Sequence, residues 1–309
     1  MATLSPVSVI IPAYNYADFL ALAIQSVLRQ DHADFELLVI DDGSTDGTAA
    51  LVAGLADPRI RYVHQANAGL SAARNTGIRL ARHPLVAFLD ADDEWLPTHL
   101  SSAVAAFQRL DPSFALVAAG SARIDASGNP LSAYPLLPAD REVPVSDIII
   151  KTRFMPSSVV VRREVFEECG LFDPSLRSSE DRDMWIRVGK RHRVYQRAAI
   201  STRIRKHGNN MSQQADRMRT SMSIVIRRAY ATEAVPHRHL SCWLQAWSLF
   251  FVQSAWMLHD AGRRLEAFRD SCLAFVVCPW PLRPGDFSER PYFRLRALLR
   301  FAASLFAAR

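Results

Sequence analysis

Two hydrophobic periodicities alternate along the first 120 residues of the chain. Short, almost uninterrupted apolar runs, typical of buried strands, occur at residues 7–11, 35–40, 60–64, 85–89 and 114–119. Between these runs, apolar side chains recur at the spacing of one helix face, at residues 19–29, 48–55, 71–81 and 98–110. Strands that alternate with helices predict an α/β fold with a mostly parallel, doubly wound sheet.

The pattern changes after residue 120. Residues 125–145 are rich in Pro, Ala and Ser and predict an irregular segment, after which residues 157–163 return to a short strand. Residues 180–188 predict the start of a helix, because Glu180 and Asp181 suit its first turn. Beyond Met211 the pattern is mostly helical.

Carboxylates gather directly after two of the predicted strands. Asp41 and Asp42 follow the second apolar run, and Asp90, Asp92 and Asp93 follow the fourth. Parallel α/β sheets bind ligands at the carboxyl ends of their strands. Neighbouring carboxylates also raise one another's pKa, so the second cluster predicts that a positively charged group binds there.

The charge of the chain is unevenly distributed. The net charge is +6, but residues 1–181 carry 14 Lys and Arg against 23 Asp and Glu, a net of −9, and residues 182–309 carry 23 against 8, a net of +15. An anionic membrane surface and nucleic acid are both candidate partners for the basic half. The basic residues match no recognised nucleic-acid-binding motif, which argues against nucleic acid.

The four cysteines show no CxxC pairing, which favours a reducing compartment over a disulfide framework or a zinc site. The N-terminal stretch lacks the basic region and the long apolar core of a signal peptide. We therefore expect a cytoplasmic protein.

Five motifs follow one another along the chain: VSVIIPAYN, ELLVIDDGSTDGT, NAGLSAARNTGI, FLDADDEW and SEDRDMWIRV. In this order and spacing they resemble the family 2 glycosyltransferases, which are inverting enzymes with a nucleotide-sugar-binding GT-A fold. The resemblance covers roughly residues 7–188 and weakens after Ser212. It implies a GT-A catalytic domain over residues 1–210, with a nucleotide-sugar-binding half at 1–120 and an acceptor-side half at 121–210. A helical C-terminal extension follows at 211–309.

The resemblance also implies a nucleotide site. Its base and ribose contacts correspond here to Pro12, Ala13, Tyr14, Asp41 and Asp42, and Arg74 and Asn75 stand where the diphosphate is bound. Arginine and free helix N–H groups suit phosphates. Taken alone, the DDGSTDG stretch is more typical of a turn with a helix cap, and Arg74 is equally typical of a solvated helix face.

The DADD stretch corresponds to the family's DxD-type motif, which binds Mn²⁺ or Mg²⁺ at the sugar nucleotide's diphosphate. Hard divalent ions prefer oxygen ligands. The resemblance implies Asp92 as a direct ligand, Asp90 as an orienting or water-bridged ligand, and Asp93 in either role. His207 is a further metal or diphosphate ligand by resemblance. The alternatives are an acidic loop that caps the next helix and a surface histidine.

The family's acidic ED motif corresponds to Glu180 and Asp181. An inverting displacement needs a base for the acceptor hydroxyl, and the resemblance implies Asp181 in that role, with Glu180 as an acceptor-side or structural contact. Without the preceding motifs, the pair would be typical of an acidic first turn of a helix.

The C-terminal segment ends in an amphipathic pattern. Leu295, Leu298, Leu299, Ala302, Leu305 and Phe306 make one stripe, with Arg294, Arg296 and Arg300 off it. Such a helix either packs on the protein's own core or lies on an anionic bilayer. The bilayer alternative predicts peripheral contact with the inner face of the cell membrane.

The resemblance implies transfer of a sugar from a nucleotide-diphosphate sugar, UDP-sugars being the commonest donors, to a saccharide or lipid-linked acceptor in surface polysaccharide, lipopolysaccharide or related glycan synthesis. Two alternatives remain open. One is a non-catalytic nucleotide- or nucleic-acid-binding module, and the other is a metal-dependent nucleotidyltransferase, which would have no use for the late Glu180 and Asp181 pair.

Overall fold

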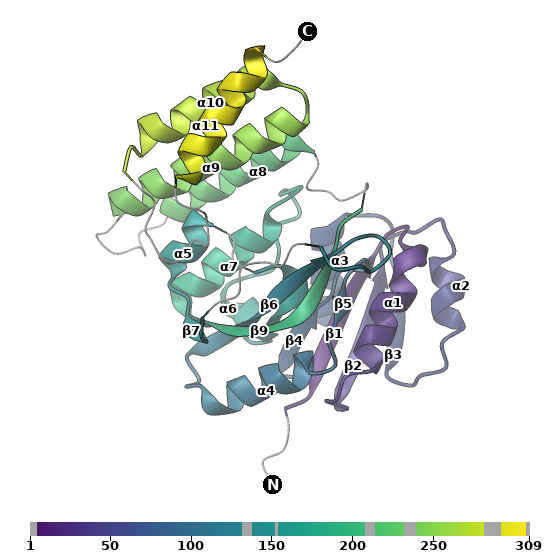
Figure 1. Cartoon of the computed structure of the whole chain (residues 1–309). Helices are drawn as coiled ribbons and strands as arrows, with labels where there is room; N and C mark the ends of the chain where they lie inside the picture. The colour runs from purple at the N-terminus through teal and green to yellow at the C-terminus, as the bar shows by residue number, and fades with distance from the viewer. Residues whose placement is uncertain are drawn as a thin grey trace. The chain divides into compact units, whose positions relative to one another are not determined.

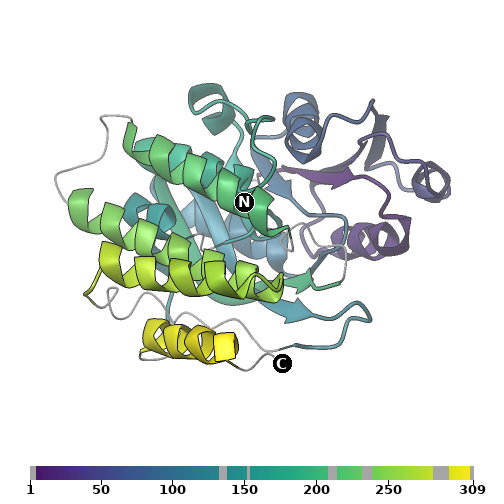
Figure 2. The same cartoon turned by 90° about the horizontal axis from the view of Figure 1, so that it is seen from above.

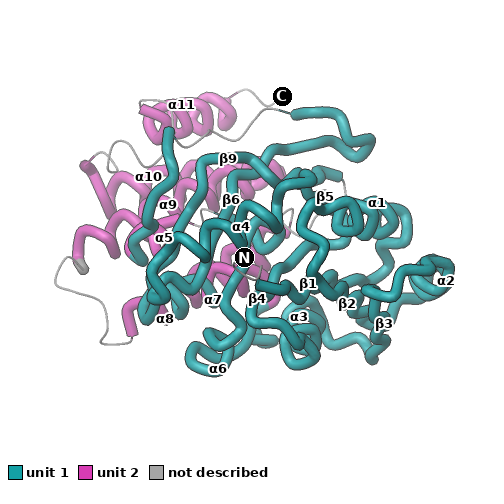
Figure 3. The backbone as a smooth tube through the Cα atoms, turned by 90° about the horizontal axis from the view of Figure 1, so that it is seen from below, with its two compact units in different colours: residues 1–145, 153–176, 184–208 teal, residues 146–152, 177–183, 209–309 magenta. Residues whose placement is uncertain are grey.

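The structure is a computed structural model that describes residues 5–131, 138–151, 154–207, 214–231, 239–280 and 292–306 (Figure 1). The chain forms two compact units, coloured separately in Figure 3. The first consists of residues 1–145, 153–176 and 184–208, and the second of residues 146–152, 177–183 and 209–309. This division differs from the domain limits expected from the sequence, residues 1–210 and 211–309, which stay a prediction.

A nine-stranded sheet forms the first unit, in the order β3-β2-β1-β4-β8-β6-β9-β5, with β7 paired to β9. Its strands are β1 (Val7–Ala13), β2 (Phe35–Asp41), β3 (Ile60–His64), β4 (Leu85–Phe88), β5 (Glu94–Trp95), β6 (Phe114–Ile124), β7 (Arg141–Glu142), β8 (Val159–Arg162) and β9 (Arg193–Arg205). The pairs among β1 to β4 are parallel, as is β6 with β9, and β8 lies antiparallel between β4 and β6. The predicted α/β class is confirmed.

Helices cover both faces of this sheet. β1 and β2 are buried along their whole length, so their sequences are continuous apolar runs and not alternating ones. On one face, α1 (Ala17–Leu28) and α4 (His99–Arg109) share a hydrophobic core with β1. On the other, α3 (Leu70–Leu80) approaches β1 so closely that a Cβ on Gly77 would lie 2.4 Å from Ile10 Cγ2. Glycine is therefore required at that crossing.

The predicted apolar runs all fall on observed strands, and the predicted helices of the first 120 residues fall on α1, α2 (Thr48–Ala53), α3 and α4. Two predictions for the middle of the chain were incomplete. The segment expected to be irregular contains β7 and the start of α5 (Val145–Ile150). The 13-residue strand β9 was missed because its many polar and charged residues hide the usual strand pattern.

The second unit is helical in its described residues. Beyond residue 213 it contains α8 (Ala215–Ala231), α9 (His239–Asp260), α10 (Arg264–Val277) and α11 (Phe293–Phe306), which confirms the helical C-terminal extension. Figure 2, seen from above, shows α9, α10 and α11 running alongside one another. In the described part of the chain, no helix has the length and hydropathy needed to cross a bilayer.

Candidate active site

The carboxyl ends of β1 and β2 bring the predicted nucleotide-binding residues together. Ala13 is paired with Asp41 in the sheet, and Asp42 N–H donates to the Ala13 carbonyl at 2.8 Å. Pro12 belongs to the same end of β1, and Tyr14, directly after the strand, is exposed. The backbone edge and the two carboxylates therefore share one corner of the sheet.

Asp41 is an ionised, firmly held carboxylate. Its Oδ1 accepts from Ser44 N–H at 2.8 Å, and its Oδ2 accepts from the Tyr62 hydroxyl. Burial raises the pKa of Asp41, but the hydrogen bonds from Ser44 and Tyr62 outweigh it, so the net pKa is lowered. Burial and the bond to Asp41 also raise the pKa of Tyr62 to about 12, so Tyr62 stays a donor.

Asp42 organises the loop in front of α3. Its Oδ1 accepts from Gln65 Nε2 at 2.7 Å and from Ala68 N–H at 3.0 Å, and its Oδ2 accepts from Gly69 N–H at 2.7 Å. Gly69 has a φ of 91°, which glycine adopts without strain. Asp42 is thus a loop support, and its two oxygens keep acceptor capacity for one further donor.

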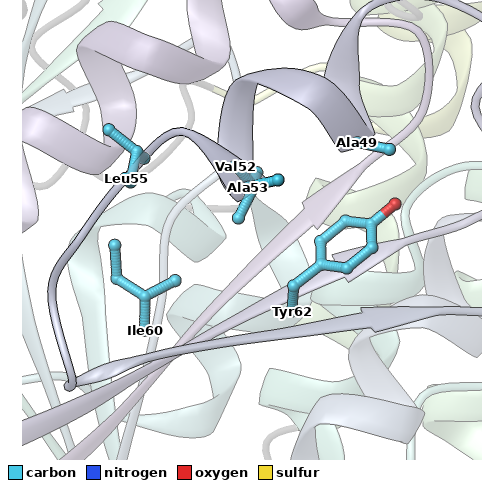
Figure 4. Close-up of a pocket in the computed structure, with 6 residues that line it drawn as sticks. All are labelled: Ala49, Val52, Ala53, Leu55, Ile60 and Tyr62. Carbon is cyan, nitrogen blue, oxygen red and sulfur yellow. The ribbon is translucent and has the colours of Figure 1, made fainter.

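An apolar groove of about 470 Å³ lies beside Tyr62, between α2 and β3 (Figure 4). The residues that line it are Ala49, Val52, Ala53, Leu55, Ile60 and Tyr62. The only side-chain polar group among these residues is the Tyr62 hydroxyl, which donates to Asp41. A nucleotide needs several convergent polar groups, so this groove is not the nucleotide site.

The predicted phosphate-binding pair on α3 is buried. The Arg74 guanidinium donates to Asp90 Oδ1 at 2.6 Å and lies 5.5 Å from the centre of the Phe172 ring. The Asn75 amide exchanges two hydrogen bonds with the Phe172 backbone, at 2.8 and 2.9 Å. The alternative of a solvated Arg74 is therefore wrong. Asn75 anchors the Phe172 segment, and its predicted contact with the nucleotide stays a prediction.

The acidic residues after β4, Asp90, Asp92, Asp93 and Glu94, form what we call the acid turn. Asp90 is paired with Arg74, and the Asp92 Oδ2 lies 2.9 Å from the Nε2 of His207. Burial, and then the charge of Asp90, raise the pKa of Asp92. Burial, and then the charges of Asp92 and Asp90, raise the pKa of Asp93. The turn is therefore short of positive charge.

Asp93 supports the turn from inside. It is only 4% exposed, its Oδ2 accepts from the Ser157 hydroxyl at 2.5 Å, and its Oδ1 accepts from Arg205 N–H at 3.0 Å. Because both oxygens are hydrogen-bonded within the fold, Asp93 holds the turn in place. Its role as a metal ligand stays a prediction, as do those of Asp92 and Asp90.

Arg205, at the end of β9, ties the acid turn to the rest of the unit. Its side chain donates to the Asp92 carbonyl at 3.0 Å, to the Ala126 carbonyl at 2.9 Å and to the Glu94 carboxylate. The sequence analysis missed Arg205 because it missed β9. The run of basic residues at the end of that strand was the available signal.

His207 lies against the acid turn, as predicted, and the surface alternative is wrong. Its side chain is 8% exposed, stacks on Phe19 at a centroid distance of 5.1 Å and meets the edge of Tyr16 at 5.8 Å. Burial, and then the charges of Asp92, Asp90 and Asp93, raise the pKa of Tyr16 to about 12. Tyr16 was also missed, and it keeps a neutral hydroxyl beside the carboxylates.

The donor set of the acid turn fits a hard divalent ion in part. Among the described residues, no three His, Cys, Asp or Glu side chains converge as a complete metal cage. Mg²⁺ sites commonly use one or two carboxylates, with water and substrate phosphates completing the shell. The Asp92 and His207 pair, in a turn with raised carboxylate pKa values, meets that smaller requirement.

Glu180 and Asp181 form the first turn of α7 (Glu180–Arg191). Residues 180–183 group with the second unit, and the remainder of α7 with the first. Asp181 Oδ1 accepts from Arg182 N–H at 2.7 Å, and the buried Arg182 guanidinium donates to the Ile149 carbonyl at 2.5 Å. Ser179, just before the helix, has a left-handed φ of 57°, a strained conformation of the kind often found at functional sites. The predicted base role of Asp181 stays a prediction.

Comparison of the sequence with known proteins finds a matching family and several relatives. The sequence model described as Glycosyl transferase family 2 matches residues 8–170. WcaA of Escherichia coli, a glycosyl transferase named for colanic acid biosynthesis, is 34% identical over 190 residues, which is 59% of this chain and 65% of WcaA. The chain spans less than two thirds of the length of the first curated relatives it matches.

Two solved structures share the fold. The mannosyltransferase PcManGT of Pyrobaculum calidifontis has a TM-score of 0.65 at 20% identity, covering 100% of this chain and 82% of its own. TarS of S. aureus has a TM-score of 0.61 at 19% identity, covering 87% of this chain and 89% of its own. These likenesses confirm the GT-A fold, and the family match shows that the chain belongs to family 2 of the glycosyl transferases.

Proposed function

We propose that this protein is an inverting glycosyltransferase that moves a sugar from a nucleotide-diphosphate sugar to an acceptor hydroxyl. The observation that carries the proposal is the acid turn. Asp92 touches His207 and Asp90 is paired with the buried Arg74, at the end of β4. In the same sheet, Asp41 and Asp42 follow β2, which is separated from β4 by β1, with β1 parallel to both. A charge-deficient carboxylate cluster at strand ends suits a cation-bridged diphosphate.

On the donor side, the end of β1 and the two carboxylates after β2 form the proposed pocket for the base and ribose. Ionised Asp41 and the remaining acceptor capacity of Asp42 suit the N–H and O–H groups of a nucleoside. We propose a UDP-sugar as donor. TarS has been solved with UDP-GlcNAc, and PcManGT with GDP-Man and Mn²⁺, so related folds accept both nucleotide classes.

Asp92 and His207, with Asp90, would hold the proposed Mn²⁺ or Mg²⁺. When bound, such an ion neutralises negative charge on a departing nucleoside diphosphate. The chain's own part is to hold these ligands rigidly. Arg205 and Ser157 anchor the turn from inside, and Phe19 and Tyr16 orient the His207 ring. Rigid placement of this kind lowers the reorganisation that the reaction needs.

On the acceptor side, we propose Asp181 as the base that takes the proton of the acceptor hydroxyl, with Glu180 as its neighbour in the first turn of α7. The acceptor class we propose is a saccharide or a lipid-linked saccharide of a surface polysaccharide. The name of WcaA, which places that relative in colanic acid biosynthesis, supports this class. The cytoplasmic location stays a prediction.

The test measures nucleoside diphosphate release from UDP- and GDP-sugars with Mn²⁺, with Mg²⁺ and with chelator. We expect metal-dependent release that Asp92→Asn abolishes and that Asp34→Asn, at an exposed acid, leaves unchanged. Nucleotide binding without turnover of any donor, metal present, would favour the binding module. Release of pyrophosphate from a nucleoside triphosphate and a sugar phosphate would favour the nucleotidyltransferase.

A further inference from the structure

The C-terminal helix α11 has a fixed inner face. Phe301 is fully buried, with its ring 5.0 Å from that of Trp256. Arg294, expected from the sequence to lie among the polar residues, is instead buried, and donates to the Ser248 hydroxyl at 2.9 Å and to the Cys278 carbonyl at 2.6 Å. These contacts determine which side of α11 faces outward.

The outward face of α11 is apolar. Leu295 is 44% exposed, Leu299 is 61% exposed and Phe306 is 89% exposed. They lie four and seven positions apart, so they share one side of the helix, opposite Phe301. In Figures 1 and 2, α11 lies on the outer side of α9 and α10, and no other described helix of this unit covers it. Large side chains in such a row indicate an interaction surface.

The positive charge beside this row of apolar side chains indicates what kind of surface binds there. Arg296 and Arg300 are exposed and flank it, and the Arg300 guanidinium stacks 4.8 Å above the Trp256 ring. The sequence from 292 to 306 contains no Asp or Glu. A second copy bound through the same patch would set these arginines against one another, which disfavours a symmetric dimer. A lipid bilayer with an apolar interior and negatively charged headgroups matches both the apolar row and the arginines.

We propose that the outward face of α11, formed by Leu295, Leu299, Phe306, Arg296 and Arg300, binds the surface of an anionic lipid bilayer. The helix has 14 residues and is about 21 Å long, too short for a hydrocarbon core of about 30 Å. It therefore lies in the interface, with its leucines and phenylalanine among the acyl chains and its arginines at the headgroups. This inference does not depend on the chemistry proposed for the acid turn.

The test is flotation of the full-length protein with vesicles of phosphatidylcholine alone and of phosphatidylcholine with about 30% phosphatidylglycerol. We expect binding only to the anionic vesicles, weakened by salt. Leu299→Glu should bind at least about tenfold more weakly, since an apolar anchor is lost and a negative charge is added. Arg296→Glu should bind about fivefold more weakly or worse.

Two matched changes on exposed helix positions of the first unit serve as controls. Leu22→Glu on α1 and Arg109→Glu on α4 make the same chemical changes away from α11 and should bind like the unaltered protein. No binding to the anionic vesicles, or equal binding by Leu299→Glu and Leu22→Glu, would overturn the proposal. So would a dimer that forms without lipid and that Leu299→Glu dissociates, because a second copy would then be the occupant. Vesicle binding is measured without substrate, so a protein that transfers no sugar still tests this surface.

Discussion

Each of the two units contains buried carboxylates, but the positively charged partners of these carboxylates differ. In the helical unit, Asp270 is fully buried and accepts from Arg219 at 2.8 Å, from Arg269 at 3.0 Å and from Ser254 at 2.5 Å. Its single charge meets two guanidinium groups. In the acid turn, Asp90 is paired with Arg74, Asp92 with His207 and Glu94 with Arg205, and Arg203 lies 3.9 Å from Glu94.

That difference separates a structural cluster from a binding site. Asp270 has all the positive charge it needs from its own helices, so it fastens α8, α9 and α10 together. The acid turn leaves Asp92 and Asp93 with raised pKa values, because burial and mutual repulsion are not fully compensated. A binding site for a cation has to be incomplete in this way, since a saturated cluster offers the ion nothing.

The largest effect expected from this comparison is on activity. Asp92→Asn should reduce metal-dependent sugar transfer about a thousandfold, or ~4 kcal/mol in transition-state stabilisation, because it removes the proposed ligand of the ion that meets the leaving group. The melting temperature should hold or rise, since the change also relieves repulsion within the turn. Steady-state rates and thermal melts check this, with Asp34→Asn as the matched control.

The converse change, in the helical unit, should lower stability and leave the rate of sugar transfer unchanged. Asp270→Asn leaves Arg219 without its buried partner and should lower the free energy of unfolding by about 3 kcal/mol. Sugar transfer per folded molecule should stay unchanged at a temperature where the variant is folded. Denaturant titration and rates normalised to folded protein measure the two quantities. Loss of turnover in a folded variant would contradict the division between structural cluster and site.

The acid turn could be predicted from the sequence because its carboxylates are contiguous and follow a strongly apolar run. The residues that complete it could not be predicted in the same way. Arg205 meets Asp93 across 112 positions, and the Ser157 hydroxyl reaches it across 64. The pairing of β9 with β5, Glu94 opposite Arg203, and with β6 brings the end of β9 to this corner, and the polar sequence of β9 gave no strand signal. His207 was predicted by resemblance to a family pattern, not by periodicity.

The same limit explains the surprises at Arg74 and Arg294. Both look like surface arginines in a helical pattern, and both are buried because a specific distant group accepts from them. Sequence periodicity ranks arginine as polar and so places it outside. Burial of a charge depends on a partner that the chain supplies elsewhere, which a local pattern does not contain.

A smaller effect is expected at the support of the acid turn. Arg205→Lys keeps the positive charge but loses the planar fork that reaches the carbonyls of Asp92, Asp125 and Ala126 and the Glu94 carboxylate. We expect a loss of about 2 kcal/mol in the free energy of unfolding and weaker Mn²⁺ binding. Arg203→Lys, at the exposed neighbour, is the control and should change little. If both variants behaved alike in denaturant titrations, Arg205 would not be the anchor of the turn.

The smallest effect is a pH dependence of metal stabilisation. Because the pKa values of Asp92 and Asp93 are raised above 3.8 in the fold, folding takes up protons, and the contribution of these groups to stability falls as the pH rises through their folded pKa values. A bound divalent ion favours the ionised carboxylates and releases those protons. Mn²⁺ should therefore stabilise the protein more at pH 8 than at pH 5, by about 1 kcal/mol, measured as the metal-induced shift in melting temperature. Asp92→Asn should remove the pH-dependent part of that shift and Asp270→Asn should keep it, since of these two clusters it is the acid turn whose carboxylates have raised pKa values. An equal shift at both pH values in the unaltered protein would mean that ion binding is not coupled to the protonation of these carboxylates.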